Sequence, residues 1–198
     1  GFKDRGAKFQ LAYYKPSSGM NKEHQELYQK NRFAVIRQLK YSKKNENSID
    51  MGIFVNGLPI ITAELKNSLT GQFVSNAIKQ YKNDRDPREP LLAFKRCLVH
   101  FAVGNEKVYM ATRLSGHKTR FLPFNIDTEN PINPNGHKTA YLWEDVWQKD
   151  TLLDLIDNYL CLQKNTEKYF EKAKGLVEKT SETMIFPRFH QLDCVRSI

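Results

Sequence analysis

Cysteine is scarce in this chain of 198 residues. Cys97, Cys161 and Cys194 lie far apart, form no Cys-x-x-Cys pair and have no histidine at zinc-finger spacing. This spacing argues against a disulfide framework and against the common structural zinc sites. The cysteine usage is typical of a reducing compartment, so the expected location is the cytoplasm.

Long apolar runs are also lacking, as is the phosphate-binding loop of an ATPase. No run approaches the roughly 20 apolar residues that a membrane-spanning helix needs, and no basic segment followed by an apolar stretch opens the chain. The pattern Gly-x-x-x-x-Gly-Lys-Ser/Thr is absent. We therefore expect no membrane contact and no complete ATPase motor within these residues.

The composition that is present is that of a globular domain with excess positive charge. Hydrophobic residues make up 40% of the chain, aromatic residues 12% and charged residues 27%, as in ordinary folded domains. The 31 Lys and Arg residues outnumber the 22 Asp and Glu residues, which gives a formal charge of +9. Such a charge favours a polyanionic partner, although a solubilising surface explains it equally well.

Hydrophobic periodicity predicts a mixed α/β region followed by a helical region. Residues 1–20 form a loosely structured lead-in. Helices are expected over 21–30 and 72–85, and strands over 33–39, 48–55, 58–66, 97–103 and 107–112. After a loop at 125–138, helices are expected over 141–147, 152–162 and 164–179. The predicted fold class is therefore α/β, with a mixed β-sheet flanked by helices and followed by a helical linker.

The hairpin at 48–66 carries the residues that point to a chemical function. Asp50, Glu64 and Lys66 are its charged side chains near the open end. Two carboxylates can hold Mg²⁺ through oxygen, and an ammonium can orient water or neutralise a phosphate. Because side chains alternate along a strand, Glu64 and Lys66 share one face. This trio is what cleavage of a phosphodiester bond requires.

Whether Asp50 meets Glu64 depends on the register of the hairpin. A two-residue turn at Asn56-Gly57 with uninterrupted pairing sets Asp50 opposite Ala63. A three-residue loop or a nearby bulge adds one residue and sets Asp50 opposite Glu64. We predict this second register, and we expect that Gly52 leaves room beside the carboxylates for a metal or a phosphate.

The segment Phe54-Val55-Asn56-Gly57-Leu58-Pro59-Ile60-Ile61-Thr62-Ala63-Glu64-Leu65-Lys66 closely resembles the nuclease segment of type I restriction enzyme R subunits, a family of PD-(D/E)xK nucleases. The resemblance begins near Asn31-Arg32-Phe33-Ala34-Val35 and continues through Ala77-Ile78-Lys79-Gln80-Tyr81. It extends into Tyr141-Leu142-Trp143-Glu144 and Leu152-Leu153-Asp154-Leu155-Ile156. The chain departs from the family pattern in two places. Ile49 replaces the proline, and the Gln-x-x-x-Tyr element has Ala77 in its first position.

The resemblance implies roles for individual residues. Asp50 and Glu64 would bind Mg²⁺, with the Leu65 carbonyl as a further ligand, and Lys66 would be the catalytic lysine. DNA is expected to contact the following helix through Lys79, Gln80, Tyr81, Lys82 and Arg85, whose cations would hold phosphates without reading sequence.

The C-terminal segment carries a second resemblance. Phe186-Pro187-Arg188-Phe189-His190-Gln191 is similar to the segment that introduces the first motor domain of superfamily 2 helicases, with Gln191 as the residue that reads adenine. The alternative is a partly buried helix start. We accordingly expect an endonuclease domain at 1–125, a helical extension and linker at 126–184, and the start of a truncated helicase-like ATPase domain at 185–198.

The predicted function is Mg²⁺-dependent hydrolysis of double-stranded DNA. The resemblance further implies methyltransferase and specificity subunits as partners, and ATP as a cofactor of the full-length subunit alone. Two alternatives remain open: a non-catalytic module of nuclease fold that docks DNA or other subunits, and a basic RNA-binding protein. The retention of Asp50, Glu64 and Lys66 argues against the first, and the lack of an arginine-rich or aromatic stacking motif argues against the second.

Overall fold

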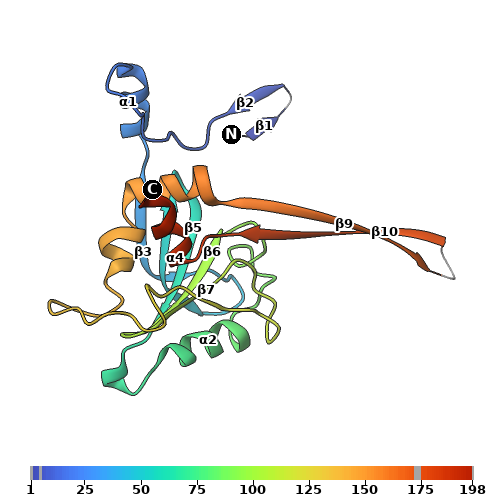
Figure 1. Ribbon diagram of the computed structural model, residues 1–198. Helices are drawn as coiled ribbons and strands as arrows, with labels where there is room; N and C mark the ends of the chain where they lie inside the picture. The colour runs from blue at the N-terminus through green and yellow to red at the C-terminus, as the bar shows by residue number, and fades with distance from the viewer. Residues whose placement is uncertain (1, 5, 172–174, 198) are drawn as a thin grey trace.

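The computed structural model describes residues 2–4, 6–171 and 175–197 (Figure 1). Its centre is a six-stranded sheet in the order β3-β4-β5-β6-β7-β8. Strands β5 and β6 are parallel and the other neighbouring pairs are antiparallel. The strands are β3 (Phe33–Lys40), β4 (Ser48–Val55), β5 (Leu58–Leu65), β6 (Val99–Val103), β7 (Val108–Ala111) and β8 (Leu122–Pro123). The expected mixed sheet is thereby confirmed.

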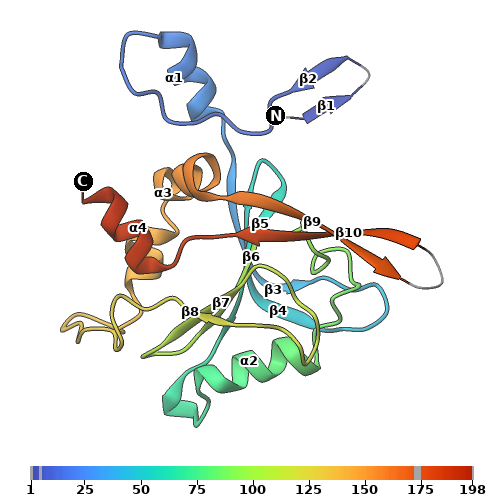
Figure 2. The ribbon, with the colours of Figure 1, turned by 45° about the vertical axis from the view of Figure 1, so that its right-hand side comes forward.

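Helices cover both faces of this sheet. Helix α2 (Val74–Asn83) lies against one face, where Ala77 and Tyr81 are fully buried. Helix α3 (Lys149–Asp154) and helix α4 (Phe189–Arg196) lie on the other side (Figure 2). The expected helices over 141–147 and 152–162 correspond to α3 and two π-helical turns, η2 (Leu142–Val146) and η3 (Leu155–Tyr159). The second ends earlier than expected, because a strand begins at Cys161. A short 3-10 turn, η1 (Ser68–Thr70), precedes α2.

The C-terminal residues share the main hydrophobic core with the sheet. Phe186 and Phe189 are each 8% exposed and pack against Phe101 and Phe124, with ring centroids 6.2 Å and 6.0 Å apart. Leu142, Val146 and the leucines of α3 belong to the same cluster. The three expected domain ranges, 1–125, 126–184 and 185–198, therefore contribute to one core. A smaller cluster on the α2 side contains Ile49, Tyr81, Leu92 and Leu114.

The expected helix over 164–179 is wrong. Strands β9 (Cys161–Glu171) and β10 (Gly175–Ile185) form an antiparallel hairpin that projects from the body of the molecule (Figure 1). The charges that suggest a helix pair across strands instead, because Lys164 is paired with Glu182 and Lys168 with Glu178. Their nitrogen to oxygen distances are 3.4 Å and 2.6 Å. Threonines and aromatic residues, which favour strands, lie among these charges.

The N-terminal lead-in has more structure than expected. Strands β1 (Phe2–Asp4) and β2 (Ala7–Phe9) pair in a short hairpin, and α1 (Lys22–Gln29) confirms the helix expected over 21–30. Asn21 caps α1 by accepting a hydrogen bond from the His24 amide at 3.1 Å. Among the described residues, no helix combines the length and apolar character needed to cross a bilayer.

Candidate active site

A bulge in the β4–β5 hairpin brings Asp50 opposite Glu64. The turn has two residues, Asn56 and Gly57, with φ angles of 51° and 81°, and it pairs Val55 with Leu58. The register then shifts, because Phe54 pairs with Pro59 but Ile53 pairs with Ile61. Ile60 is the extra residue. Continuing the observed pairing of Met51 with Ala63 by one position sets Asp50 opposite Glu64, so the predicted register is confirmed through its bulge alternative.

Asp50 lies at the edge of the site and is within reach of both neighbouring strands. Its side chain is 22% exposed, and its Oδ2 accepts a hydrogen bond from the Leu65 amide at 2.8 Å. The ammonium of Lys66 lies 3.6 Å from the same oxygen, and Gln38 donates to Oδ1 at 3.3 Å. The structure thus brings the predicted Asp50 and Lys66 together at the end of the hairpin.

Glu64 is fully buried, and only one of its two carboxylate oxygens has a hydrogen-bond partner. Its Oε1 accepts a hydrogen bond from Nε of Arg85 at 2.7 Å, while its Oε2 has no hydrogen-bond partner. Burial raises the pKa of Glu64, the hydrogen bond and charge of Arg85 lower it, and the nearby Asp50 raises it, so that the net pKa is about 7. An unpaired buried carboxylate oxygen is costly, and either a proton or a bound cation would relieve that cost.

The donors of this site fit Mg²⁺. Among the described residues, no group of three or more His, Cys, Asp or Glu side chains forms a closed metal cage. Mg²⁺ seldom needs one, because it keeps several waters and binds through one or two carboxylates and substrate phosphates. Asp50 and the free Oε2 of Glu64 are hard oxygen donors of this kind. The role of the Leu65 carbonyl as a further ligand stays a prediction.

The space expected beside Gly52 is filled. A Cβ placed on Gly52 would lie 2.8 Å from Cδ2 of Leu39 and 3.0 Å from Cε2 of Phe54. The glycine therefore admits two apolar side chains rather than a metal or a phosphate, and the expectation of an open space there is wrong.

Two of the five residues expected to bind DNA are buried. Tyr81 is fully buried, and its hydroxyl lies 3.0 Å from Oγ1 of Thr62. Arg85 is 5% exposed and is engaged with Glu64. Burial argues against direct DNA contact by either side chain, and both assignments stay predictions. Lys79 is exposed, while Gln80 and Lys82 are half-buried, and for these three DNA contact stays a prediction.

The role of Arg85 was detectable in the sequence. Ala77, Tyr81 and Arg85 are spaced by four residues, so Arg85, two residues after the end of α2, continues the buried side of that helix rather than the side of Lys79 and Lys82. Gln38 had no comparable signal, because its contact with Asp50 depends on how β3 pairs with β4.

Gln191 caps a helix in this structure. Its Oε1 accepts a hydrogen bond from the Arg188 amide at 2.9 Å, at the start of α4. This bond satisfies a backbone group at the beginning of the helix. Reading of adenine by Gln191 stays a prediction.

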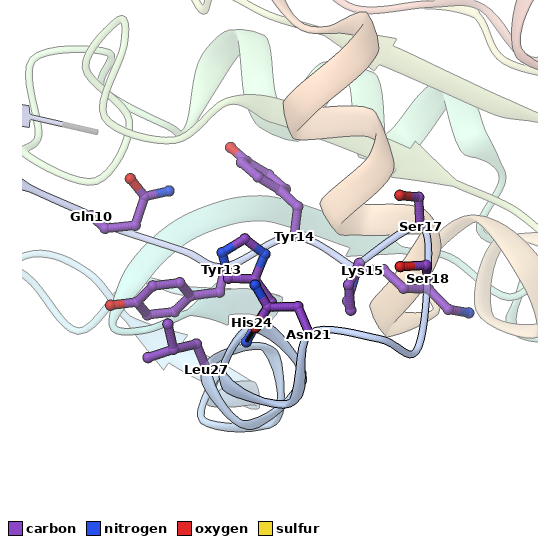
Figure 3. Close-up of a pocket in the computed structure, with 10 residues that line it drawn as sticks. Gln10, Tyr13, Tyr14, Lys15, Ser17, Ser18, Asn21, His24 and Leu27 are labelled. Atoms are coloured by element: carbon purple, nitrogen blue, oxygen red, sulfur yellow. Dashed lines mark hydrogen bonds between the residues drawn. The ribbon is translucent and has the colours of Figure 1, made fainter.

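One cavity borders the candidate site at Lys66, and another lies in the N-terminal region. A hollow of about 220 Å³ is bordered by Leu65, Lys66, Val103 and Trp143. A larger hollow of about 590 Å³ lies between residues 10–18 and α1, with Tyr13, Tyr14 and His24 around it (Figure 3). None of the predicted site residues lines this second hollow.

Comparisons with known proteins give a consistent result. A family profile described as the type I restriction enzyme R protein N terminus matches residues 10–119, which is more than half of the chain. A protein of Methanocaldococcus jannaschii, named as a type I restriction enzyme MjaVIIIP endonuclease subunit, is 28% identical over 179 residues. The match covers 85% of this chain and 15% of that protein, so the chain spans a small part of its relative's length.

Proposed function

The chain belongs to the family of type I restriction enzyme R protein N termini, and on this basis we propose that it is the DNA-cleaving domain of a restriction enzyme, dependent on Mg²⁺. The observation that carries the proposal is the pair of carboxylates across the bulged hairpin. Glu64 has a buried oxygen without a partner, opposite Asp50, with the ammonium of Lys66 3.6 Å from Oδ2 of Asp50.

Each side chain of the trio has a distinct part in this proposal. Asp50 and Glu64 present oxygen donors, and Mg²⁺ held there would supply Lewis acidity toward a phosphate oxygen. Lys66, whose side chain is 12% exposed, is held close to Asp50 and still reaches the surface. Its ammonium orients the attacking water or neutralises the charge that develops on the phosphate. Exposed Lys79 holds neighbouring phosphates without reading sequence.

We further propose that the domain acts within a larger assembly. The type I restriction family implies a complex of several subunits acting on DNA. Methyltransferase and specificity subunits would be its partners, and the specificity subunit would select the DNA site. ATP would be used by a motor in the longer subunit, where Gln191 would read adenine. The substrate is double-stranded DNA, and the compartment is the cytoplasm.

The test is cleavage of plasmid DNA by the complete complex in Mg²⁺. Glu64→Ala and Lys66→Ala should each lower the cleavage rate by at least about 100-fold, because each removes a group that stabilises the charge of the transition state. Lys79→Ala, a matched surface change, should instead weaken DNA binding and make it less sensitive to salt. If both site variants cut at the wild-type rate, the domain is a non-catalytic docking module and the proposal is wrong.

A further inference from the structure

Arg85 connects the end of α2 with strands β4 and β5, which carry the two carboxylates of the proposed site. It follows α2 in the chain, its Nε donates to Oε1 of Glu64 at 2.7 Å, and its Nη2 donates to the backbone carbonyl of Ser48 at 2.7 Å. Glu64 lies at the end of β5, and Ser48 begins β4 two residues before Asp50. One guanidinium therefore spans the two strands that carry the carboxylates.

Resting on the proposed function, we propose that Arg85 is a positioning residue of the nuclease site, which holds Glu64 so that its free oxygen is presented beside Asp50. This role replaces the DNA contact that its charge suggests. Arg85 touches neither the metal nor the DNA and acts through Glu64.

The geometry of the guanidinium supports this role. Its donors are fixed in a plane, so bonds from Nε and Nη2 to two different strands define both the distance and the orientation between them. Because Oε1 of Glu64 is occupied by Arg85, Oε2 is the oxygen left for a cation. The ring of Tyr41, whose centroid is 5.7 Å from Cζ of Arg85, covers the guanidinium from another side.

The burial of the pair excludes a direct role in DNA binding. The side chain of Arg85 is 5% exposed and that of Glu64 is fully buried. A phosphate cannot approach a guanidinium that is enclosed by protein and already bonded to a carboxylate. By contrast, Arg88 is 87% exposed and pairs with Asp86 at 2.8 Å, away from the site.

The test measures binding of Mn²⁺ to the 198-residue chain by calorimetry, with anisotropy of a labelled DNA duplex as the second readout. Arg85→Ala should weaken Mn²⁺ binding by about 10 to 100-fold, the usual effect of removing a group that orients a metal ligand. Its affinity for DNA without divalent ions should not change. Lys79→Ala should show the reverse pattern, with weaker DNA binding and unchanged Mn²⁺ binding.

Two further variants separate positioning from general loss of structure. Arg85→Lys keeps the charge, but its single ammonium lacks the planar fork that reaches both Glu64 and Ser48, so its Mn²⁺ affinity should fall between those of wild type and Arg85→Ala. Arg88→Ala removes the same charge three residues later and should leave Mn²⁺ binding unchanged. Circular dichroism identifies any unfolded variant, and if Arg85→Ala fails to fold, Arg85→Lys decides the test.

The outcomes distinguish this inference from the proposed function. Wild-type Mn²⁺ binding that is lost in Glu64→Gln but fully kept in Arg85→Lys and Arg85→Ala would overturn the role of Arg85 alone. A wild-type chain that binds no Mn²⁺ would overturn the proposed metal site and this inference with it.

Discussion

Glu64 is held under two opposing influences. Its burial favours the neutral acid, while Arg85 favours the carboxylate, and the outcome is a pKa raised to about 7. The proximity of Asp50, Glu64 and Lys66 could be predicted from the sequence, because strand alternation and the family motif agree. Their electrostatic state could not, because it depends on Arg85, which the chain brings to Glu64 from 21 residues away.

The raised pKa predicts a specific dependence of stability on pH. Between the ordinary value of 4.5 and about 7, the unfolded chain is ionised at Glu64 and the folded chain is protonated. The stabilisation is therefore fully present below pH 4.5 and is lost as the pH rises through 7, by about 3 kcal/mol. In urea unfolding with a chelator present, this decline should appear as the difference in unfolding free energy between wild type and Glu64→Gln.

A second buried group, His100, changes stability with pH in the opposite direction. Burial lowers the pKa of His100 to about 3, so its contribution to stability falls as the pH drops below the ordinary value of 6.5. Because both proteins contain His100, its contribution cancels in the difference between wild type and Glu64→Gln. Parallel stability curves for the two proteins would show that Glu64 is already ionised at low pH.

At the scale of an element, the sequence of the β4–β5 hairpin predicts its turn but not the position of its bulge. For Asp50 to lie opposite Glu64, the hairpin needs one extra residue between them, and Asn56-Gly57 indicated where the turn lies. The position of the bulge depends on contacts outside the hairpin. The strand after the bulge pairs in parallel with β6, where Glu64 pairs with Ala102, and the Lys66 amide donates to the Val103 carbonyl at 2.9 Å. The pairing with β6 cannot be predicted from the sequence of the hairpin alone.

If pairing with β6 fixes the register of the β4–β5 hairpin, strain in the Asn56-Gly57 turn should lower stability and leave the carboxylate site intact. Gly57 has a φ of 81°, and a Cβ added there meets nothing within 4 Å. Gly57→Ala should therefore lower the free energy of unfolding by about 1 to 2 kcal/mol through backbone strain alone. Urea unfolding measures this loss, and a Mn²⁺ titration should show unchanged affinity.

Gly57→Asn is the matched control, because asparagine tolerates the left-handed conformation better than alanine. It should lose less stability than Gly57→Ala. Weaker Mn²⁺ binding in both variants would mean that the turn, and not the pairing with β6, sets the position of Glu64.

At the scale of the molecule, the sheet and its helices were predictable and the region after residue 160 was not. Strands β3 to β7 and helices α1 and α2 follow from clear periodicity within each segment. The β9–β10 hairpin escaped prediction because lysines and glutamates spaced by four residues suit a helix as well as they suit cross-strand pairs. Its aromatic residues Tyr169 and Phe170 are exposed and do not pack into the core.

The projecting hairpin should be dispensable for the stability of the body. Leu162 pairs with Met184, so replacing residues 163–183 by Asn-Gly joins them through a two-residue turn. The main core keeps its residues, and the ion pairs removed with the hairpin, including that of Glu182 with Lys95 on the body of the molecule, are partly exposed and worth little. Thermal unfolding should shift by no more than a few degrees. A collapse of the transition would show that the hairpin is needed to fold the sheet.

The link through Arg85 also makes the site cooperative. Ser48, Glu64 and the end of α2 share one buried guanidinium, so none of them can move away without leaving a charge or a carbonyl unpaired inside the protein. Partial opening is consequently the least favourable state. A change that displaces Arg85 would therefore disturb Glu64 and the β4 backbone near Asp50 at the same time.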